Sequence, residues 1–68
     1  MTGVAVLGSG FMARTHMAAW AANADRAQVR VVASRTTDGA RAAAGDSGAD
    51  ATDDLAAAIA RDDVDVVD

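Results

Sequence analysis

The chain has 68 residues, a net charge of −4 and no cysteine, so broad nucleic-acid binding, disulfides and thiolate metal sites are all disfavoured. No run approaches the roughly 20 apolar residues of a membrane span, and Met1-Thr2-Gly3 lacks the basic start of a signal peptide. We therefore expect a cytoplasmic protein without nucleic-acid or membrane partners.

The first half of the chain predicts a strand followed by a helix. Val4–Leu7 is apolar at successive positions, as in a strand covered on both faces. The pattern then favours a helix from about Phe11 to Ala24, ended by the polar segment Asn23–Arg26. One face of this helix is apolar and is expected to pack on the sheet through Ala13, Met17, Trp20, Ala21 and Ala24.

A second strand and a second helix follow. Val29–Ala33 predicts the strand, and Ser34–Asp38 predicts a loop. Thr37 or Asp38 is a suitable N-cap for a helix over roughly Gly39–Ala44, and one of the glycines that come next supplies the stop. These elements repeat the alternation of the first pair.

The last third of the chain predicts one more helix between two strands. Ala49–Ala51 is a short strand of poor propensity. Thr52-Asp53-Asp54 opens a helix, because a hydroxyl can cap it and carboxylates favour its positive end. Leu55 and Ile59, four residues apart, mark its buried side, and Val64–Val67 is the fourth strand.

Strands that alternate with helices predict the α/β class, here a Rossmann-type doubly wound parallel sheet in the order 3-2-1-4. In this order the winding reverses between the first and fourth strands, and a crevice opens above Gly8–Gly10. Domains usually run to about 100–150 residues. We expect residues 1–68 to be the N-terminal part of a dinucleotide-binding domain, with the rest of that domain and a substrate domain absent from the chain.

A glycine-rich turn joins the first strand to the first helix. Gly8 lets the chain leave the strand tightly, Gly10 lets the backbone approach a pyrophosphate, and Ala13 replaces a third glycine where helix packs on strand. Free N–H groups and the helix dipole then favour phosphate. The pattern predicts a pyrophosphate site formed by Gly8, Ser9, Gly10, Phe11, Met12 and Ala13.

The end of the second strand bears on the choice of cofactor. NAD-binding proteins place an acidic residue about 20 residues beyond the glycines, but this chain has Ser34-Arg35-Thr36 there. Ser34 can bond a hydroxyl or a phosphate oxygen, and Arg35 can pair with a 2′-phosphate and stack on adenine. These three residues therefore favour NADP over NAD. The alternative is that Arg35 is a solvated loop residue.

The remaining chemistry-bearing residues suggest no catalytic group. His16 is the only histidine and has no cysteine, glutamate or second histidine to act with, so we expect a structural role or a role behind the residues that contact the ligand. Trp20 is expected to anchor a core or an interface. The acidic run Asp62–Asp65 is expected to be solvated and not to bind metal.

Residues 4–16 resemble the N-terminus of the glucose-fructose oxidoreductase/inositol dehydrogenase/MocA family, which has Gly-x-Gly-x-x-Gly-x-x-His there. Gly8, Gly10 and His16 are retained, and Ala13 stands for the third glycine. The second strand's ending, Val32–Arg35, is also similar, as are Asp53-Asp54-Leu55 and Asp63–Val67 further on.

The resemblance implies a longer oxidoreductase with a second domain for its small-molecule substrate. Such enzymes transfer hydride between NAD(P) and a sugar, cyclitol or related hydroxy compound, and we expect the full-length protein to form a homo-oligomer. The family's catalytic lysine motif lies beyond the last residue of this chain. Two alternatives stay open: a non-enzymatic, redox-sensing dinucleotide-binding module, and a methyltransferase. Against the latter, a methyltransferase usually lacks a small residue at Ala13 and ends its second strand in an acid.

Overall fold

A four-stranded parallel sheet organises the chain in the computed structural model, which describes residues 1–68. The strand order is β3-β2-β1-β4, so the predicted order 3-2-1-4 is confirmed. Every pair of neighbouring strands is parallel. The strands are β1 (Thr2–Leu7), β2 (Ala27–Ala33), β3 (Asp50–Thr52) and β4 (Val66–Val67). The predicted fourth strand began at Val64, two residues before the start of β4. The predicted third strand, Ala49–Ala51, lies one residue before β3.

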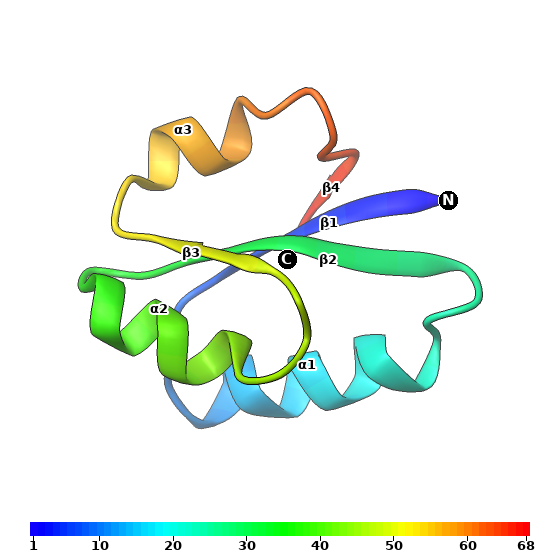
Figure 1. The fold of residues 1–68 in the computed structure, drawn as a ribbon, viewed down its shortest axis with the longest axis horizontal. Helices are drawn as coiled ribbons and strands as arrows, with labels where there is room; N and C mark the ends of the chain where they lie inside the picture. Colours follow the sequence, from blue (N-terminus) through cyan, green and yellow to red (C-terminus); the bar gives the residue numbers. More distant parts are fainter.

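Three helices cover the two faces of this sheet. They are α1 (Phe11–Ala22), α2 (Thr37–Ala44) and α3 (Leu55–Ile59). α1 and α2 lie on one face and α3 on the other, as Figure 1 shows. This is the arrangement of a partial Rossmann fold, and the predicted α/β class is confirmed. No helix is both long and apolar enough to cross a membrane.

The core consists of two apolar clusters, one on each face of the sheet. In β1, Val4 and Val6 point to the α1 and α2 side, while Ala5 between them points to the α3 side. All three are essentially inaccessible to solvent. A strand that is apolar at successive positions is therefore explained by helices on both faces.

β2 contains one more residue than its partner strand. Val4 pairs with Val29 but Ala5 pairs with Val31, so Arg30 is inserted between them. Because of this insertion, the alternation of side chains between the two faces of β2 is reversed after Arg30. Val29 therefore belongs to the cluster under α1 and α2, whereas Val31 belongs to the cluster under α3.

The apolar face of α1 is buried only in part. Ala13 is buried, and Met17 and Trp20 are half-buried against the core. The prediction was wrong for Ala21 and Ala24, which are exposed, and the helix ends two residues earlier than expected. Their methyl groups are too short to reach the sheet across the space under the end of α1.

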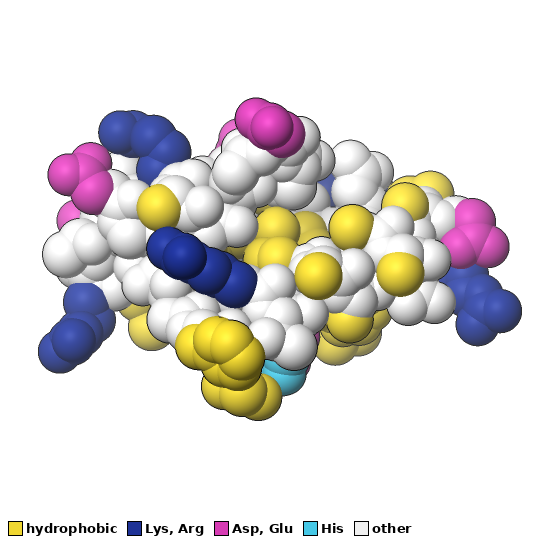
Figure 2. All heavy atoms as spheres, turned by 90° about the horizontal axis from the view of Figure 1, so that it is seen from below, with side chains coloured by type: hydrophobic (Ala, Val, Ile, Leu, Met, Phe, Trp, Pro, Cys, Tyr) yellow, Lys and Arg dark blue, Asp and Glu magenta, His cyan; other side chains and the backbone are white.

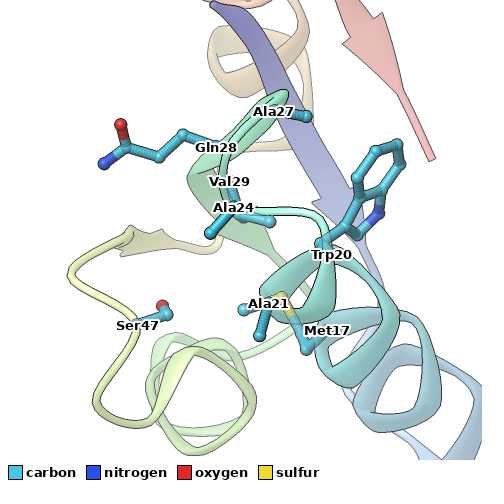
Figure 3. A pocket seen from close by; sticks show the side chains of 8 residues that line it. All are labelled: Met17, Trp20, Ala21, Ala24, Ala27, Gln28, Val29 and Ser47. Atoms are coloured by element: carbon cyan, nitrogen blue, oxygen red, sulfur yellow. The ribbon is translucent and has the colours of Figure 1, made fainter.

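That space is an apolar cavity of about 190 Å³. Figure 3 shows its lining from α1, the turn after α1, the start of β2 and the loop after α2: Met17, Trp20, Ala21, Ala24, Ala27, Gln28, Val29 and Ser47. Figure 2, which views the molecule from below the orientation of Figure 1, shows hydrophobic side chains in several separate patches among polar and backbone atoms. Small side chains in α1 thus leave the end of the helix loosely packed.

α2 is capped one residue earlier than predicted. The side chain of Thr36, not of Thr37 or Asp38, accepts a hydrogen bond from the N–H of Gly39 at 3.0 Å. Thr36 has the extended backbone that an N-cap requires, whereas Thr37 is already helical. Gly45, at φ +50°, ends the helix as expected.

α3 buries a residue other than those predicted. Leu55 and Ile59 are 39% and 48% exposed, whereas Ala58 is 1% exposed and packs on the sheet. Ala58 lies to one side of the other two on the helix surface, and its methyl group lets this five-residue helix approach closely. The larger side chains are consequently turned away from the closest contact with the sheet. Asp54 caps the helix by accepting from the N–H of Ala57.

The chain enters β4 over Gly3 of β1. The N–H of Gly3 donates to the carboxylate of Asp65 at 2.9 Å, and the N–H of Asp65 donates to the carbonyl of Gly3 at 2.7 Å. A Cβ on Gly3 would overlap the carbonyl oxygen of Asp63. Close packing of this connection thus requires glycine at position 3.

Candidate functional site

The glycine turn starts from a strand end that is held on both sides. The N–H of Leu7 donates to the carbonyl of Asp68 at 2.9 Å, and the next N–H, of Gly8, donates to the carbonyl of Ala33 at 2.7 Å. Gly8 then turns at φ +106°, a conformation that L side chains rarely adopt. The predicted tight turn is present at Gly8.

Beyond this turn, the first N–H groups of α1 are not used within the helix. Gly10 is the N-cap and has no capping side chain, and the first backbone bond of the helix runs from Arg14 to Gly10. The amides of Phe11, Met12 and Ala13 therefore have no partner one turn back. Together with the helix dipole they form a site suited to an anion.

The surroundings of these amides differ from one residue to the next. A Cβ on Gly10 would meet no protein atom within 4 Å, so the space in front of the amides is open. Phe11 and Met12 are 81% and 63% exposed at its edge, whereas Ala13 is 8% exposed and packs in the core. Ala13 therefore occupies the close helix–strand contact predicted for it.

The carboxyl ends of β1 and β2 form one polar pocket at the same edge of the sheet. Its volume is about 370 Å³, and no hydrophobic residue lines it. The lining residues are Gly8, Ser9, Gly10, Ser34, Arg35 and Thr36. The structure thus brings six of the nine predicted cofactor-binding residues together, and the other three begin α1 beside them.

Two hydroxyls of this pocket are engaged in holding the loop. Ser34 is buried, and its Oγ donates to the carbonyl of Thr36 at 2.8 Å while accepting from the N–H of Thr36. Thr36 uses its own hydroxyl to cap α2. Ser34 can therefore donate to a ligand only by giving up its bond to Thr36, and its first role is to shape the loop.

Arg35 is the only charged residue that lines the pocket. Its side chain is exposed and takes part in no hydrogen bond or ion pair. The guanidinium is consequently free to bind an anion brought to the pocket.

His16 has a partner that the sequence did not indicate. Its Nδ1 lies 3.0 Å from both carboxylate oxygens of Asp68, and the indole Nε1 of Trp20 donates to the same carboxylate at 2.8 Å. Asp68 directly follows β4, and 52 residues separate it from His16. No local pattern connects residues so far apart.

Two carboxylates of the acidic run after α3, those of Asp63 and Asp65, make contacts within the chain. Arg61 holds both carboxylate oxygens of Asp63 at 2.8 Å and also contacts Asp50 at 2.9 Å. Its hydrogen bonds lower the pKa of Asp63 and raise the pKa of Arg61. Asp65 accepts from Gly3 instead. No three acidic or histidine side chains in residues 1–68 converge as metal ligands would.

A family described as an oxidoreductase family with an NAD-binding Rossmann fold matches residues 2–68. This match and the sheet order define the class of the chain, an NAD-binding Rossmann domain of an oxidoreductase. The chain belongs to the glucose-fructose oxidoreductase/inositol dehydrogenase/MocA family, as the resemblance at residues 4–16 indicated. No curated protein and no solved structure matches it.

Proposed function

We propose that this chain holds NADP, in preference to NAD, for a dehydrogenase that acts on a sugar, a cyclitol or a similar hydroxy compound. The observation that carries the proposal is the polar pocket at the ends of β1 and β2, where the glycine turn faces an unpaired Arg35 and no carboxylate. The full-length enzyme is proposed to bind its substrate in a further domain, and to be a cytoplasmic homo-oligomer without nucleic-acid or membrane partners.

The residues present fit a dinucleotide. Unpaired amides at the start of α1 suit the pyrophosphate, and the open space at Gly10 leaves room for it. Gly8 and Ser9 line the path from there to the loop after β2. When bound, the nicotinamide supplies the hydride chemistry, and this chain positions the cofactor.

Arg35 carries the preference for NADP. A guanidinium can bind a 2′-phosphate through two hydrogen bonds, and a carboxylate at this position would repel it. The nearest acidic residue of the following helix, Asp38, is almost fully exposed and lies 3.6 Å from Arg41. Asp38 does not line the pocket.

We expect Arg35→Asp to weaken NADP binding by about 10- to 100-fold, because a charged hydrogen-bonded pair contributes about 1.5–3 kcal/mol. NAD binding should change much less. Isothermal titration of the full-length protein with each dinucleotide measures both constants. Arg41→Asp is the matched control, since it makes the same charge change on an exposed residue outside the pocket. Equal losses for NADP and NAD would contradict the role of Arg35.

The proposed function is tested by protection against heat. NADP at about 100 times its dissociation constant should stabilise the full-length protein by about 2.7 kcal/mol, seen as a rise in melting temperature. Protection by neither dinucleotide would refute the proposal, and protection by S-adenosylmethionine alone would point to a methyltransferase. Binding without hydride transfer to or from any sugar or cyclitol tested would favour the redox-sensing module.

A further inference from the structure

The carboxylate of Asp68 joins the end of β4 to α1. It accepts the indole N–H of Trp20 at 2.8 Å and lies 3.0 Å from Nδ1 of His16 through both oxygens. An ionised carboxylate only accepts, so Nδ1 of His16 carries the hydrogen of this contact. The Asp68 side chain is 26% exposed, and such partly buried, charge-assisted bonds are stronger than neutral ones.

The backbone of Asp68 lies level with the start of the glycine turn. Its N–H donates to the carbonyl of Ala5 at 2.8 Å, and its carbonyl accepts from the N–H of Leu7 at 2.9 Å. Leu7 is the last residue before Gly8. Asp68 therefore has two sets of bonds. Its backbone bonds to β1, which leads into the turn, and its side chain bonds to α1, which follows the turn.

These contacts determine how β1, β4 and α1 sit relative to one another. The pyrophosphate proposed above binds where the turn leaves β1 and enters α1, and the crevice of a Rossmann fold opens between β1 and β4. A shift of α1 relative to β4 would move the free amides of Phe11 and Met12 away from the phosphate. Ala13, Met17 and Trp20 hold α1 on the core, and the Asp68 carboxylate adds hydrogen-bonding contacts that tie α1 to the end of the two-residue strand β4.

We propose that Asp68 is a positioning residue for the dinucleotide, acting through His16 and Trp20 on α1. This inference rests on the proposed function. Asp68 is not proposed to touch the cofactor: it holds α1 at His16 and Trp20, and so fixes the helix whose first amides face the phosphate.

Asp65 offers a matched control for Asp68. Both aspartates flank β4, and both carboxylates accept hydrogen bonds from other elements, but Asp65 contacts Gly3 at the opposite end of β1. We expect Asp68→Ala to weaken NADP and NAD binding alike, by about tenfold, and Asp65→Ala to leave both constants unchanged. Titrations are made in the full-length protein at a temperature where circular dichroism shows every variant folded.

The two variants separate positioning from general destabilisation. Equal weakening by Asp65→Ala and Asp68→Ala, or wild-type affinity in Asp68→Ala, would overturn the proposal. Failure of the unmodified protein to bind any dinucleotide would instead refute the proposed function. His16→Ala combined with Asp68→Ala should weaken binding by less than the product of the single effects, since both remove one interaction.

A spectroscopic signature tests the coupling directly. The indole N–H resonance of Trp20, assigned by its loss in Trp20→Phe, should shift when NADP is added, although Trp20 does not line the polar pocket. In Asp68→Ala the resonance should no longer respond at saturating NADP. If the chemical shift of the Trp20 indole N–H does not change when NADP binds to the unmodified protein, the positioning role is overturned.

Discussion

Replacing Gly10 by alanine is expected to reduce dinucleotide affinity at least tenfold while leaving the protein as stable as before. A Cβ at Gly10 meets no protein atom within 4 Å, so folding should tolerate it. The same Cβ would occupy the space in front of the free amides of α1, where the pyrophosphate must approach closely. Calorimetric titration measures the affinity, and urea unfolding measures the stability, expected to change by no more than about 0.5 kcal/mol.

Gly8→Ala is the matched comparison, because the substitution is the same and only the backbone differs. Gly8 has φ +106°, so alanine there should lower the free energy of unfolding by about 1–3 kcal/mol. Gly10→Ala with wild-type affinity would contradict the placement of the pyrophosphate. A loss of stability at Gly10 as large as that at Gly8 would show that Gly10 is structural.

Gly3→Ala is expected to have the largest effect on stability. Its Cβ would overlap the carbonyl of Asp63, a backbone atom that cannot rotate away as a side chain can. We expect a loss of about 3 kcal/mol, at the upper end of the usual range for overpacking. Because a domain has only about 5–15 kcal/mol in total, a loss of this size should clearly lower the urea midpoint of unfolding.

Urea unfolding followed by circular dichroism measures this loss, and Gly10→Ala serves as the control for adding one methyl group to a glycine. Wild-type stability of Gly3→Ala would mean that the connection at Asp63 moves aside freely. The contacts of Asp65 with Gly3 would then be of little importance for β4.

The parallel sheet was predictable because its signals are local: Val4–Leu7 and Val29–Ala33 are short apolar runs, and each is followed by a helical pattern. The strand order followed from the glycine turn after the first strand, which is typical of the Rossmann fold. The pocket was predictable for the same reason: Gly8–Ala13 and Ser34–Thr36 each follow a strand directly. The carboxyl ends of parallel neighbours meet at one edge.

The features that the sequence did not predict depend on packing between elements, which the hydrophobic pattern does not contain. Ala58 is buried instead of the larger Leu55 and Ile59 because contact distance, not hydrophobicity, decides which side of a five-residue helix meets the sheet. The insertion at Arg30 depends on how β2 aligns with β1, which spacing within β2 does not reveal. The contact of His16 with Asp68 joins residues 52 positions apart.

The bonds of Leu7 and Gly8 to opposite neighbours have a consequence for the order of assembly. Val4 pairs with Val29 on one side and with Val66 on the other, and closing the longer loop costs about 0.8 kcal/mol more. Loop entropy therefore favours the pairing of β2 with β1 over the pairing of β4 with β1. During synthesis Ala33 is added before Asp68, so the bond from Gly8 to Ala33 can form before the bond from Leu7 to Asp68. The phosphate-binding turn is thus secured in two steps, by residues that are synthesised after it.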